Sequence, residues 1–479
     1  MNLYDELKKY SENDIYPMHM PGHKRNEAIM HMKNPYSIDI TEIEGFDNLH
    51  DAQGILKDGM ERAARLYHSE DTFYLVNGST VGLLAAIACC TKKGDKILVG
   101  RNCHKAVYNA IYLNELTPIY LYPLQIDNYD INGGISVEKV KEMLIKHPEI
   151  KMVVITSPTY EGILSDIDAI ADIVHERNIP LLVDEAHGAH FGFHESFPQS
   201  AIQKRADIVI HSIHKTLPSF TQTSLLHRNG ELVKKEEIKR YLSIYQSSSP
   251  SYLLMSSIDQ CICMLAREGN QLFDEYDRRL ESFYDKADKL KHIRIYKCQN
   301  NSMFDRGKLI ISVKGCNMNG TQLYQMLLEK YHIQMELVSK SYVLGMTSIC
   351  DTDEGFDRLI KALLELDEGM PSNMIPMLNE SEEDEVQFDP LVIALSSYET
   401  YQKEGKAILM EQSEGYISKE YVFLYPPGIP LIVPGEVISS DFIKKFKSYQ
   451  KEGLTVSGLY DKNNCYIEVV SDSQRILLL

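Results

Sequence analysis

A lysine follows an apolar run in the segment "HSIHKTLPSF" (residues 211–220). The run "ADIVI" (residues 206–210) is typical of a buried strand, so Lys215 lies just past a strand end, with Ser212 and His214 beside it. A lysine next to a buried site can act as a nucleophile, because burial lowers the pKa of its ammonium group. An ordinary lysine in a surface turn would give the same pattern, so other residues must decide between the two.

A carboxylate ends a second apolar run, in "PLLVDEAHGAH" (residues 180–190). A buried carboxylate at Asp184 is costly unless a cation compensates it. A metal ion is one alternative, with possible ligands Asp184, Glu185, His187 and His190. The two histidines follow a strand instead of sharing a helix face, and the HExxH motif is absent, so we expect no metal here.

Two further polar groups follow strands of the same region. Gly78, Ser79 and Thr80 lie between a predicted strand and a predicted helix, where backbone N–H groups and hydroxyls can bind an anion. Ser or Thr at this position is also an ordinary helix cap. Neither a Walker A lysine nor GxGxxG follows, which argues against a nucleotide. His104 follows the next strand, as either a site residue or a structural histidine.

An anion cradle, a strand-end aspartate and a lysine are together the parts that pyridoxal phosphate requires. The cradle would hold the phosphate, with Ser212 and His214 as further donors. Asp184 would pair with the pyridinium nitrogen, and Lys215 would bind the aldehyde. Ligands of open α/β sheets bind outside the carboxyl ends of the strands, which is where these residues fall.

The elements that must position these groups lie between residues 55 and 225. Short apolar, β-branched runs alternate there with amphipathic runs of helical length, which predicts a mostly parallel sheet covered on both faces. The predicted strands are residues 71–76, 95–100, 117–124, 151–158, 179–186 and 206–213, and the predicted helices are residues 79–90, 103–114, 137–147 and 166–178.

The length and composition bound the rest of the chain. The 479 residues suggest about three domains. We expect an N-terminal helix and arm at 1–50, a cofactor-binding large domain at 51–290, a small domain at 291–377, an acidic linker at 378–389 and a C-terminal domain at 390–479.

Charge and cysteine usage indicate the partners and the compartment. The net charge of −18 argues against a general nucleic-acid or anionic-membrane binder. The N-terminus has no signal-peptide core, and the longest apolar run is too short to span a bilayer. The nine cysteines are scattered without a CxxC pair, which predicts free thiols in the cytoplasm.

At this point the sequence resembles a known family, the bacterial pyridoxal-phosphate-dependent ornithine/lysine/arginine decarboxylases. The resemblance extends from residue 20 to 436, and the short Firmicute-type arginine decarboxylases are the most similar members. Its motifs are "MPGHKR", "NGSTVGLLAAI", "NCHKAVYNA", "TSPTYEGILSDI", "DEAHGAHFGF", "HSIHKTLPSFTQTSLLH", "SSSPSYLLMSSID" and "YPPGIPLIVPGE".

The resemblance implies an α/β fold of pyridoxal-phosphate fold type I, like aspartate aminotransferase. Such a fold has a large domain with a mostly parallel sheet, a small α+β domain and here an extra C-terminal α+β domain. It implies decarboxylation of a basic amino acid, best matched by L-arginine going to agmatine and carbon dioxide in polyamine biosynthesis. It also implies a homodimer or higher oligomer with shared active sites.

The resemblance assigns roles to individual residues. Lys215 would bind the cofactor aldehyde, Asp184 the pyridine nitrogen, and His187 the ring oxygen or the substrate carboxylate. His104 would stack on the ring. The phosphate would be held by Gly78, Ser79, Thr80, Ser212 and His214. Residues implied in a neighbouring subunit's site are Ser248, Ser249, Asp47 and Asp51, and Glu436 is implied as the partner of the substrate's distal cation.

Three alternatives stay open. Lysine or ornithine would fit the same motifs as arginine. Another fold-type-I enzyme, an aminotransferase or lyase, would need an arginine for the substrate carboxylate; Arg306 and Arg358 are present, but not in a context that indicates this role. A catalytically inactive regulator is the third, and the intact Lys215 and Asp184 count against it.

Overall fold

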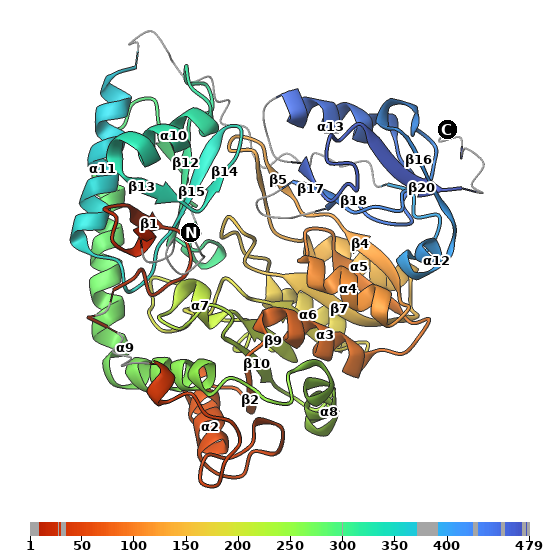
Figure 1. Cartoon of the computed structure of the whole chain (residues 1–479), viewed down its shortest axis with the longest axis horizontal. Helices are drawn as coiled ribbons and strands as arrows, with labels where there is room; N and C mark the ends of the chain where they lie inside the picture. Colours follow the sequence, from red (N-terminus) through yellow and green to blue (C-terminus); the bar gives the residue numbers. More distant parts are fainter. Residues whose placement is uncertain are drawn as a thin grey trace.

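The structure is a computed structural model of the chain, and it describes residues 9–26, 28–29, 35–298, 300–370, 391–424, 430–451, 456–471 and 476. Figure 1 shows a large α/β part, a smaller part stacked along the long helix α9 (Tyr252–Ala287), and a separate C-terminal part. The predicted acidic linker at 378–389 lies outside the described residues.

A seven-stranded sheet forms the centre of the large part, in the order β2-β10-β9-β8-β7-β3-β4. Strand β10 runs antiparallel to both of its neighbours, and the pairs from β9 across to β4 are parallel, so the prediction of a mostly parallel sheet is confirmed. The strands are β2 (Asp71–Leu75), β3 (Lys96–Gly100), β4 (Thr117–Leu121), β7 (Ile150–Thr156), β8 (Leu181–Asp184), β9 (Ile208–His211) and β10 (Ser224–Arg228).

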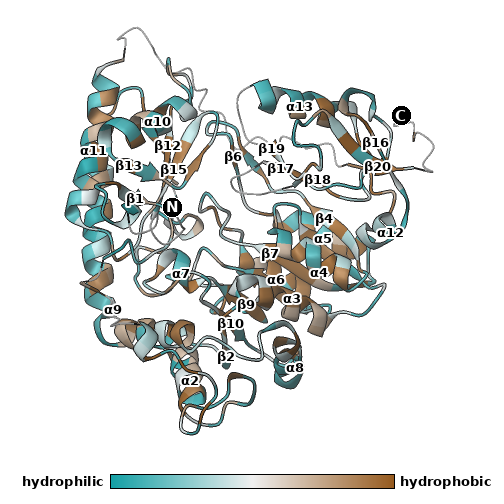
Figure 2. Cartoon of the chain, in the orientation of Figure 1, coloured by the Kyte–Doolittle hydropathy of each residue, from teal (hydrophilic) through white to brown (hydrophobic). Residues whose placement is uncertain are grey.

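Helices cover both faces of this sheet because its strands are apolar on both sides. Along β7, Met152 and Val154 belong to one hydrophobic cluster, whereas Val153 and Ile155 belong to another. The first cluster includes α3 (Gly78–Cys90), α4 (Lys105–Leu113) and α8 (Lys235–Tyr245), and the second includes α2 (Ile55–Tyr67), α5 (Val137–Lys146), α6 (Ile167–His175) and part of α9. Figure 2 shows α3 as largely hydrophobic, as expected for a helix buried between the sheet and its neighbours.

The small part follows α9 and contains a four-stranded antiparallel sheet in the order β11-β12-β15-β14. Its elements are β11 (Arg294–Ile295), β12 (Lys308–Ser312), α10 (Gly320–Tyr331), β13 (Ile333–Met335), β14 (Leu337–Val338), β15 (Tyr342–Met346) and α11 (Asp353–Glu368). The N-terminal arm joins it, because β1 (Tyr16–Met18) pairs in parallel with β13.

The C-terminal part has its own hydrophobic cluster, built around Val422, Ile432, Phe446 and Ile467. Its elements are α12 (Ser397–Gln402), β16 (Gly405–Leu409), β17 (Val422–Leu424), β18 (Pro430–Ile432), α13 (Ser440–Lys451), β19 (Val456–Ser457) and β20 (Tyr466–Val470). Short elements elsewhere are β5 (Gln125–Ile126), β6 (Ile131–Asn132), α7 (Ile213–Thr216) and the 3₁₀ turns η1 (Pro35–Ser37), η2 (Leu49–Asp51), η3 (Asn301–Met303) and η4 (Met410–Gln412). Within the described ranges, no helix combines the length and the apolar character needed to cross a bilayer.

Candidate active site

The carboxyl ends of β8 and β9 bring the predicted aspartate and lysine to the same edge of the sheet. Asp184 is the last residue of β8 and lies opposite Ile210 of β9. Lys215 lies on the single turn of helix α7 that follows β9. The parallel register therefore places both residues at one site, as their positions after strands predicted.

An imidazole lies between two lysines at this edge. Lys215 Nζ is 3.0 Å from His187 Nε2, and Lys308 Nζ is 2.7 Å from His187 Nδ1. His187 is buried, and the Tyr160 ring packs against it with the centroids 4.7 Å apart. Lys308 opens β12 of the small part, so the site combines residues of both domains. Lys308 could not be identified from the sequence, because it begins an ordinary strand far along the chain.

Burial shifts the pKa of all three groups toward the neutral form. Desolvation, together with the positive charges of Lys215 and Lys308, holds the pKa of His187 well below its usual value. Desolvation also lowers the pKa of Lys215, against the opposing effect of Asp184. It lowers the pKa of Lys308 to about 8, although Asp305 and Glu336 oppose the shift. A lysine with such a neighbourhood can supply a neutral amine near physiological pH.

The predicted anion cradle lies at the start of α3. Gly78 has a φ of +72°, and a Cβ added there would meet no atom within 4 Å, so the backbone faces open space. Thr80 is exposed, whereas the Ser79 hydroxyl lies 2.6 Å from that of Ser212. The Ser79–Ser212 contact ties the start of α3 to the end of β9. The structure thus brings three of the predicted phosphate residues together around an open helix N-terminus.

His214 and His104 flank this region from two different elements. Nδ1 of His214 donates to the Thr223 carbonyl at 2.7 Å, and desolvation lowers the pKa of this imidazole to about 4, so it is neutral. His104 caps α4 by accepting a hydrogen bond from Ala106 N at 3.2 Å. Desolvation lowers the pKa of His104, while the charges of Asp184 and Lys215 act on it in opposite directions.

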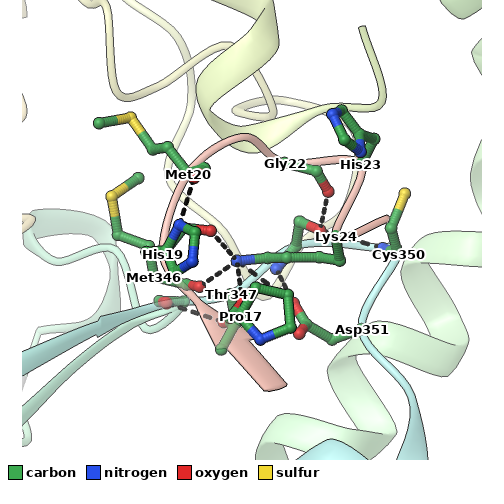
Figure 3. Close-up of polar contacts among 12 residues, drawn as sticks. Pro17, His19, Met20, Gly22, His23, Lys24, Met346, Thr347, Cys350 and Asp351 are labelled. Carbon is green, nitrogen blue, oxygen red and sulfur yellow. Dashed lines mark hydrogen bonds and ion pairs between the residues drawn. The ribbon is translucent and has the colours of Figure 1, made fainter. Parts of the chain in front are cut away.

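The N-terminal arm is fastened close to this site by Lys24. Figure 3 shows its ammonium group pointing into a ring of backbone carbonyls. Its Nζ donates to the carbonyl oxygens of Pro17 (3.3 Å), His19 (2.9 Å) and Met346 (2.5 Å), and lies 4.0 Å from Asp351 Oδ2. Lys24 therefore joins the arm to the small domain.

Gly22, in the same arm, contacts the turn that carries the lysine. Its N–H donates to the His214 carbonyl at 2.8 Å, and its own carbonyl accepts from the Ser348 hydroxyl at 2.6 Å. A Cβ on Gly22 would lie 2.7 Å from the backbone nitrogen of Leu217. The "MPGHK" motif thus holds the Lys215 turn against the small domain, and only glycine allows so close an approach.

Two expected substrate residues have other partners in this chain. Glu436 is fully buried and forms an ion pair with Arg101 at 2.9 Å, so its charge is already compensated. The Asp47 carboxylate accepts hydrogen bonds from five backbone N–H groups at the start of α2, those of Asn48, Gln53, Gly54, Leu56 and Lys57. Both carboxylates therefore stabilise the fold, and neither is included in the substrate site proposed below.

The other residues of the sequence hypotheses are placed as follows. Ser248 and Ser249 are exposed in the loop before α9, and Asp51 is exposed in η2. Arg306 pairs with Asp277, and Arg358 pairs with Asp14 and Glu354, so each of these arginines already has a carboxylate partner.

The possible metal ligands that follow β8 also have separate partners. Glu185 lies 2.7 Å from His211 in the core, and His190 lies 3.2 Å from Asp305. Within the part of the chain that the structure describes, no cluster of three or more His, Cys, Asp and Glu side chains could hold a metal.

The family model described as "Orn/Lys/Arg decarboxylase, major domain" matches residues 1–351, and the C-terminal domain model of the same family matches residues 389–460. The chain belongs to the Orn/Lys/Arg decarboxylase family. It is 33% identical to an arginine decarboxylase of Bacillus subtilis over 99% of this chain and 98% of that protein. It is 31% identical to an arginine decarboxylase of Bacillus anthracis, again over 99% and 98% of the two chains.

Solved structures of the family share the fold. The lysine decarboxylase LdcF of Francisella novicida superposes with a TM-score of 0.79 at 22% identity, over 97% of this chain and 80% of that one. Lysine decarboxylase A of Pseudomonas aeruginosa gives a TM-score of 0.76 at 20% identity, over 90% and 73% of the two chains. The predicted family, fold type and enzyme class, an amino-acid decarboxylase that uses pyridoxal phosphate, are confirmed.

The residues present fit the cofactor that the family implies. Asp184 is 3% exposed and, among the described residues, forms no ion pair with a lysine or arginine; its Oδ1 accepts a hydrogen bond from Ala186 N at 3.2 Å. A buried carboxylate of this kind needs a cation, and a protonated pyridine nitrogen would supply one. The open helix N-terminus at Gly78 would take the phosphate.

Proposed function

We propose that this protein decarboxylates L-arginine to agmatine and carbon dioxide, with pyridoxal phosphate held on Lys215. The observation that carries the proposal is the Lys215 amine, 3.0 Å from the buried His187 imidazole at the strand edge that also bears Asp184. The choice of arginine is supported by relatives named arginine decarboxylase that match almost the full length of the chain at 31–33% identity.

Each of these side chains has a defined chemical task. When bound, pyridoxal phosphate supplies an electron-withdrawing ring that accepts the electron pair released as carbon dioxide leaves. Asp184 would hold the proton on the ring nitrogen, because a buried carboxylate favours a cation beside it. Thr80, Ser79, Ser212 and the α3 N-terminus would bind the phosphate, and His104 would lie against the ring and exclude water.

The amine of Lys215 must be neutral to bond the cofactor and to release it to the substrate. The lowered pKa of Lys215 supports this requirement. The reaction also consumes one proton at the substrate Cα, and His187 and Lys215 are the groups placed to deliver it.

A direct assay tests the reaction and the choice of substrate together. Purified protein is incubated in turn with arginine, lysine and ornithine, and carbon dioxide and amine products are measured. We expect the highest kcat/KM for arginine; a preference for lysine or ornithine would overturn the substrate, and a keto-acid product would overturn the reaction.

A variant pair tests the role of Lys215. Lys215→Ala should lose the visible absorbance of the lysine-bound cofactor and at least about a thousandfold in turnover. Lys239→Ala is the matched control, because Lys239 is exposed on α8. Wild-type turnover in Lys215→Ala would contradict the proposed function.

We further propose a homodimer, or a higher homo-oligomer, that acts in the cytoplasm and supplies polyamine biosynthesis. Exposed apolar side chains in the segment before and at the start of α2 support an interface there, namely Tyr36, Ile38, Ile43, Phe46 and Ile55. Ser248 would reach a neighbouring site from the loop before α9.

The nine free cysteines support a reducing compartment. Sedimentation at the mass of a 54.8 kDa monomer would contradict the oligomer.

A further inference from the structure

The second lysine on His187 is the feature that the proposed function does not use. Lys308 is 1% exposed, and its side chain passes from the small domain to the large one. The Lys308 side chain lies against Gly162, where an added Cβ would lie 2.7 Å from Lys308 Cγ and where φ is +98°. The chain thus has glycine at the position where any side chain would obstruct this lysine.

A count of hydrogens shows that the two lysines cannot both be charged. A neutral imidazole has one N–H and one lone pair, whereas an ammonium group can only donate. His187 therefore accepts through one nitrogen, from a lysine that can be charged, and donates through the other, to a lysine that must be neutral. The tautomer of His187 decides which lysine can carry a positive charge.

Lys308 carries its proton at neutral pH, because burial and the charge of Lys215 lower its pKa only to about 8, against Asp305, Glu336 and Glu161. Asp184 and Glu336 act in the same way on Lys215, but the pyridine nitrogen of the cofactor would compensate Asp184. Asp305 and Glu161 are themselves buried, and Tyr160 places its ring 5.5 Å from Lys308 Nζ. With Lys308 charged, His187 carries its hydrogen on Nε2 and donates it to a neutral Lys215.

We propose that Lys308 is a positioning residue that acts through His187: it keeps Lys215 neutral and resupplies the proton that decarboxylation consumes. This inference rests on the proposed function, because it uses Lys215 as the cofactor lysine. The contacts that carry it are the two hydrogen bonds on either side of one buried imidazole.

The proton transfer balances without any further reactant. Lys308 Nζ gives a proton to Nδ1 as Nε2 gives its own to Lys215 Nζ, so the imidazole stays neutral and changes tautomer. The substrate loses carbon dioxide and takes up one proton, and the electron pair of the broken bond ends in the new Cα–H bond. Lys308 then regains a proton from solvent or buffer.

The test measures how the full-length apoprotein captures added pyridoxal phosphate, followed by visible absorbance across pH. Capture requires neutral Lys215, so its pH midpoint reports the protonation of that amine without any turnover. In Lys308→Met, His187 can offer a lone pair to a charged Lys215. We expect the midpoint to rise by about one pH unit, which is about a tenfold slower capture at neutral pH. The rates should converge with wild type at high pH, where Lys215 is neutral in both proteins.

Lys308→Arg distinguishes the effect of the positive charge of Lys308 from the effect of the proton that it can release. Arginine keeps the positive charge but does not release its proton, so the midpoint should stay near wild type while kcat falls at least about tenfold at unchanged KM. Lys314→Met, just beyond β12, is the surface control and should match wild type in both measurements.

The outcomes are distinguishable from failure of the proposed function. A wild-type midpoint in Lys308→Met, slow capture at every pH, or a wild-type kcat in Lys308→Arg would each overturn the role of Lys308. Capture by Lys215→Ala equal to that of wild type, or no carbon dioxide from any basic amino acid, would instead overturn the proposed function.

Discussion

Two lysines are buried where the small domain meets the rest of the chain, and they differ in what surrounds the ammonium group. Lys24 faces three carbonyl oxygens and the Asp351 carboxylate, all of which can only accept hydrogens. Lys308 faces an imidazole, which can accept or donate. Burial lowers the pKa of both lysines. Burial alone therefore does not make a lysine reactive, because the group that accepts its hydrogen bond decides whether its proton can move.

The greatest loss of stability is predicted for replacement of Lys24, the lysine that faces carbonyl oxygens. Lys24→Met leaves three carbonyls without this donor and the buried Asp351 carboxylate without its cation, so we expect the free energy of unfolding to fall by about 3–5 kcal/mol. Urea denaturation measures it. Asp351→Asn added to Lys24→Met should recover part of the loss, because it removes the uncompensated charge. A loss below about 1 kcal/mol would show that Lys24 does not hold the N-terminal arm against the small domain.

The second prediction uses the pH dependence of stability. The pKa of Lys308 is about 8 in the folded chain and 10.5 ordinarily, so between these values the unfolded chain binds more protons. The free energy of unfolding should therefore rise with pH across this window, by at most about 3 kcal/mol from this group.

Lys308→Met should remove that rise. The measurement is urea denaturation of wild type, Lys308→Met and Lys314→Met at pH 7.5–8 and again near pH 10. Parallel profiles for all three proteins would show that Lys308 is not held in a proton-releasing environment.

The third and smallest effect concerns the link between the two regions. Gly22→Ala places a Cβ 2.7–2.8 Å from the backbone of Leu217 and Thr216, so the arm must move away from the Lys215 turn. We expect a loss of about 1–2 kcal/mol in stability and weaker cofactor binding, measured by thermal unfolding and by absorbance titration.

Gly269→Ala is the matched control for this substitution. A Cβ at Gly269 in α9 would lie 3.9 Å from the nearest atom, so alanine should stabilise the helix by up to about 1 kcal/mol. Cofactor affinity at the wild-type level in Gly22→Ala would show that the arm does not position the Lys215 turn.

Most of the large domain could be predicted from local patterns. The strands and helices between residues 71 and 216 could be predicted from alternating apolar runs, since the residues that each element buries recur at a regular spacing within it. Asp184 and Lys215 stood out because a charged side chain directly after a buried strand must have a partner. The link between the arm and the small domain was not predictable, because β1 pairs with β13 across more than half of the chain.

For two carboxylates of the sequence hypotheses, the partners in the fold could not be read from the sequence. Glu436 stands in a distinctive motif, but its partner Arg101 lies 335 residues earlier and takes up its charge. The family resemblance implies Asp47 in a neighbouring subunit's site, and in this chain its carboxylate accepts hydrogen bonds from the backbone of its own segment. Charge type alone does not show whether a carboxylate is already paired.

The family, the mostly parallel sheet and the places of Lys215 and Asp184 after strands could be predicted, because they depend on local periodicity and on motifs within short stretches. The position of His187 between Lys215 and Lys308 depends on the tertiary structure, since His187 and Lys308 belong to different domains and lie 121 residues apart in the chain. It also decided which buried lysine is fastened by carbonyls and which faces an imidazole. Both outcomes depend on packing between elements, which the order of residues along the chain does not show.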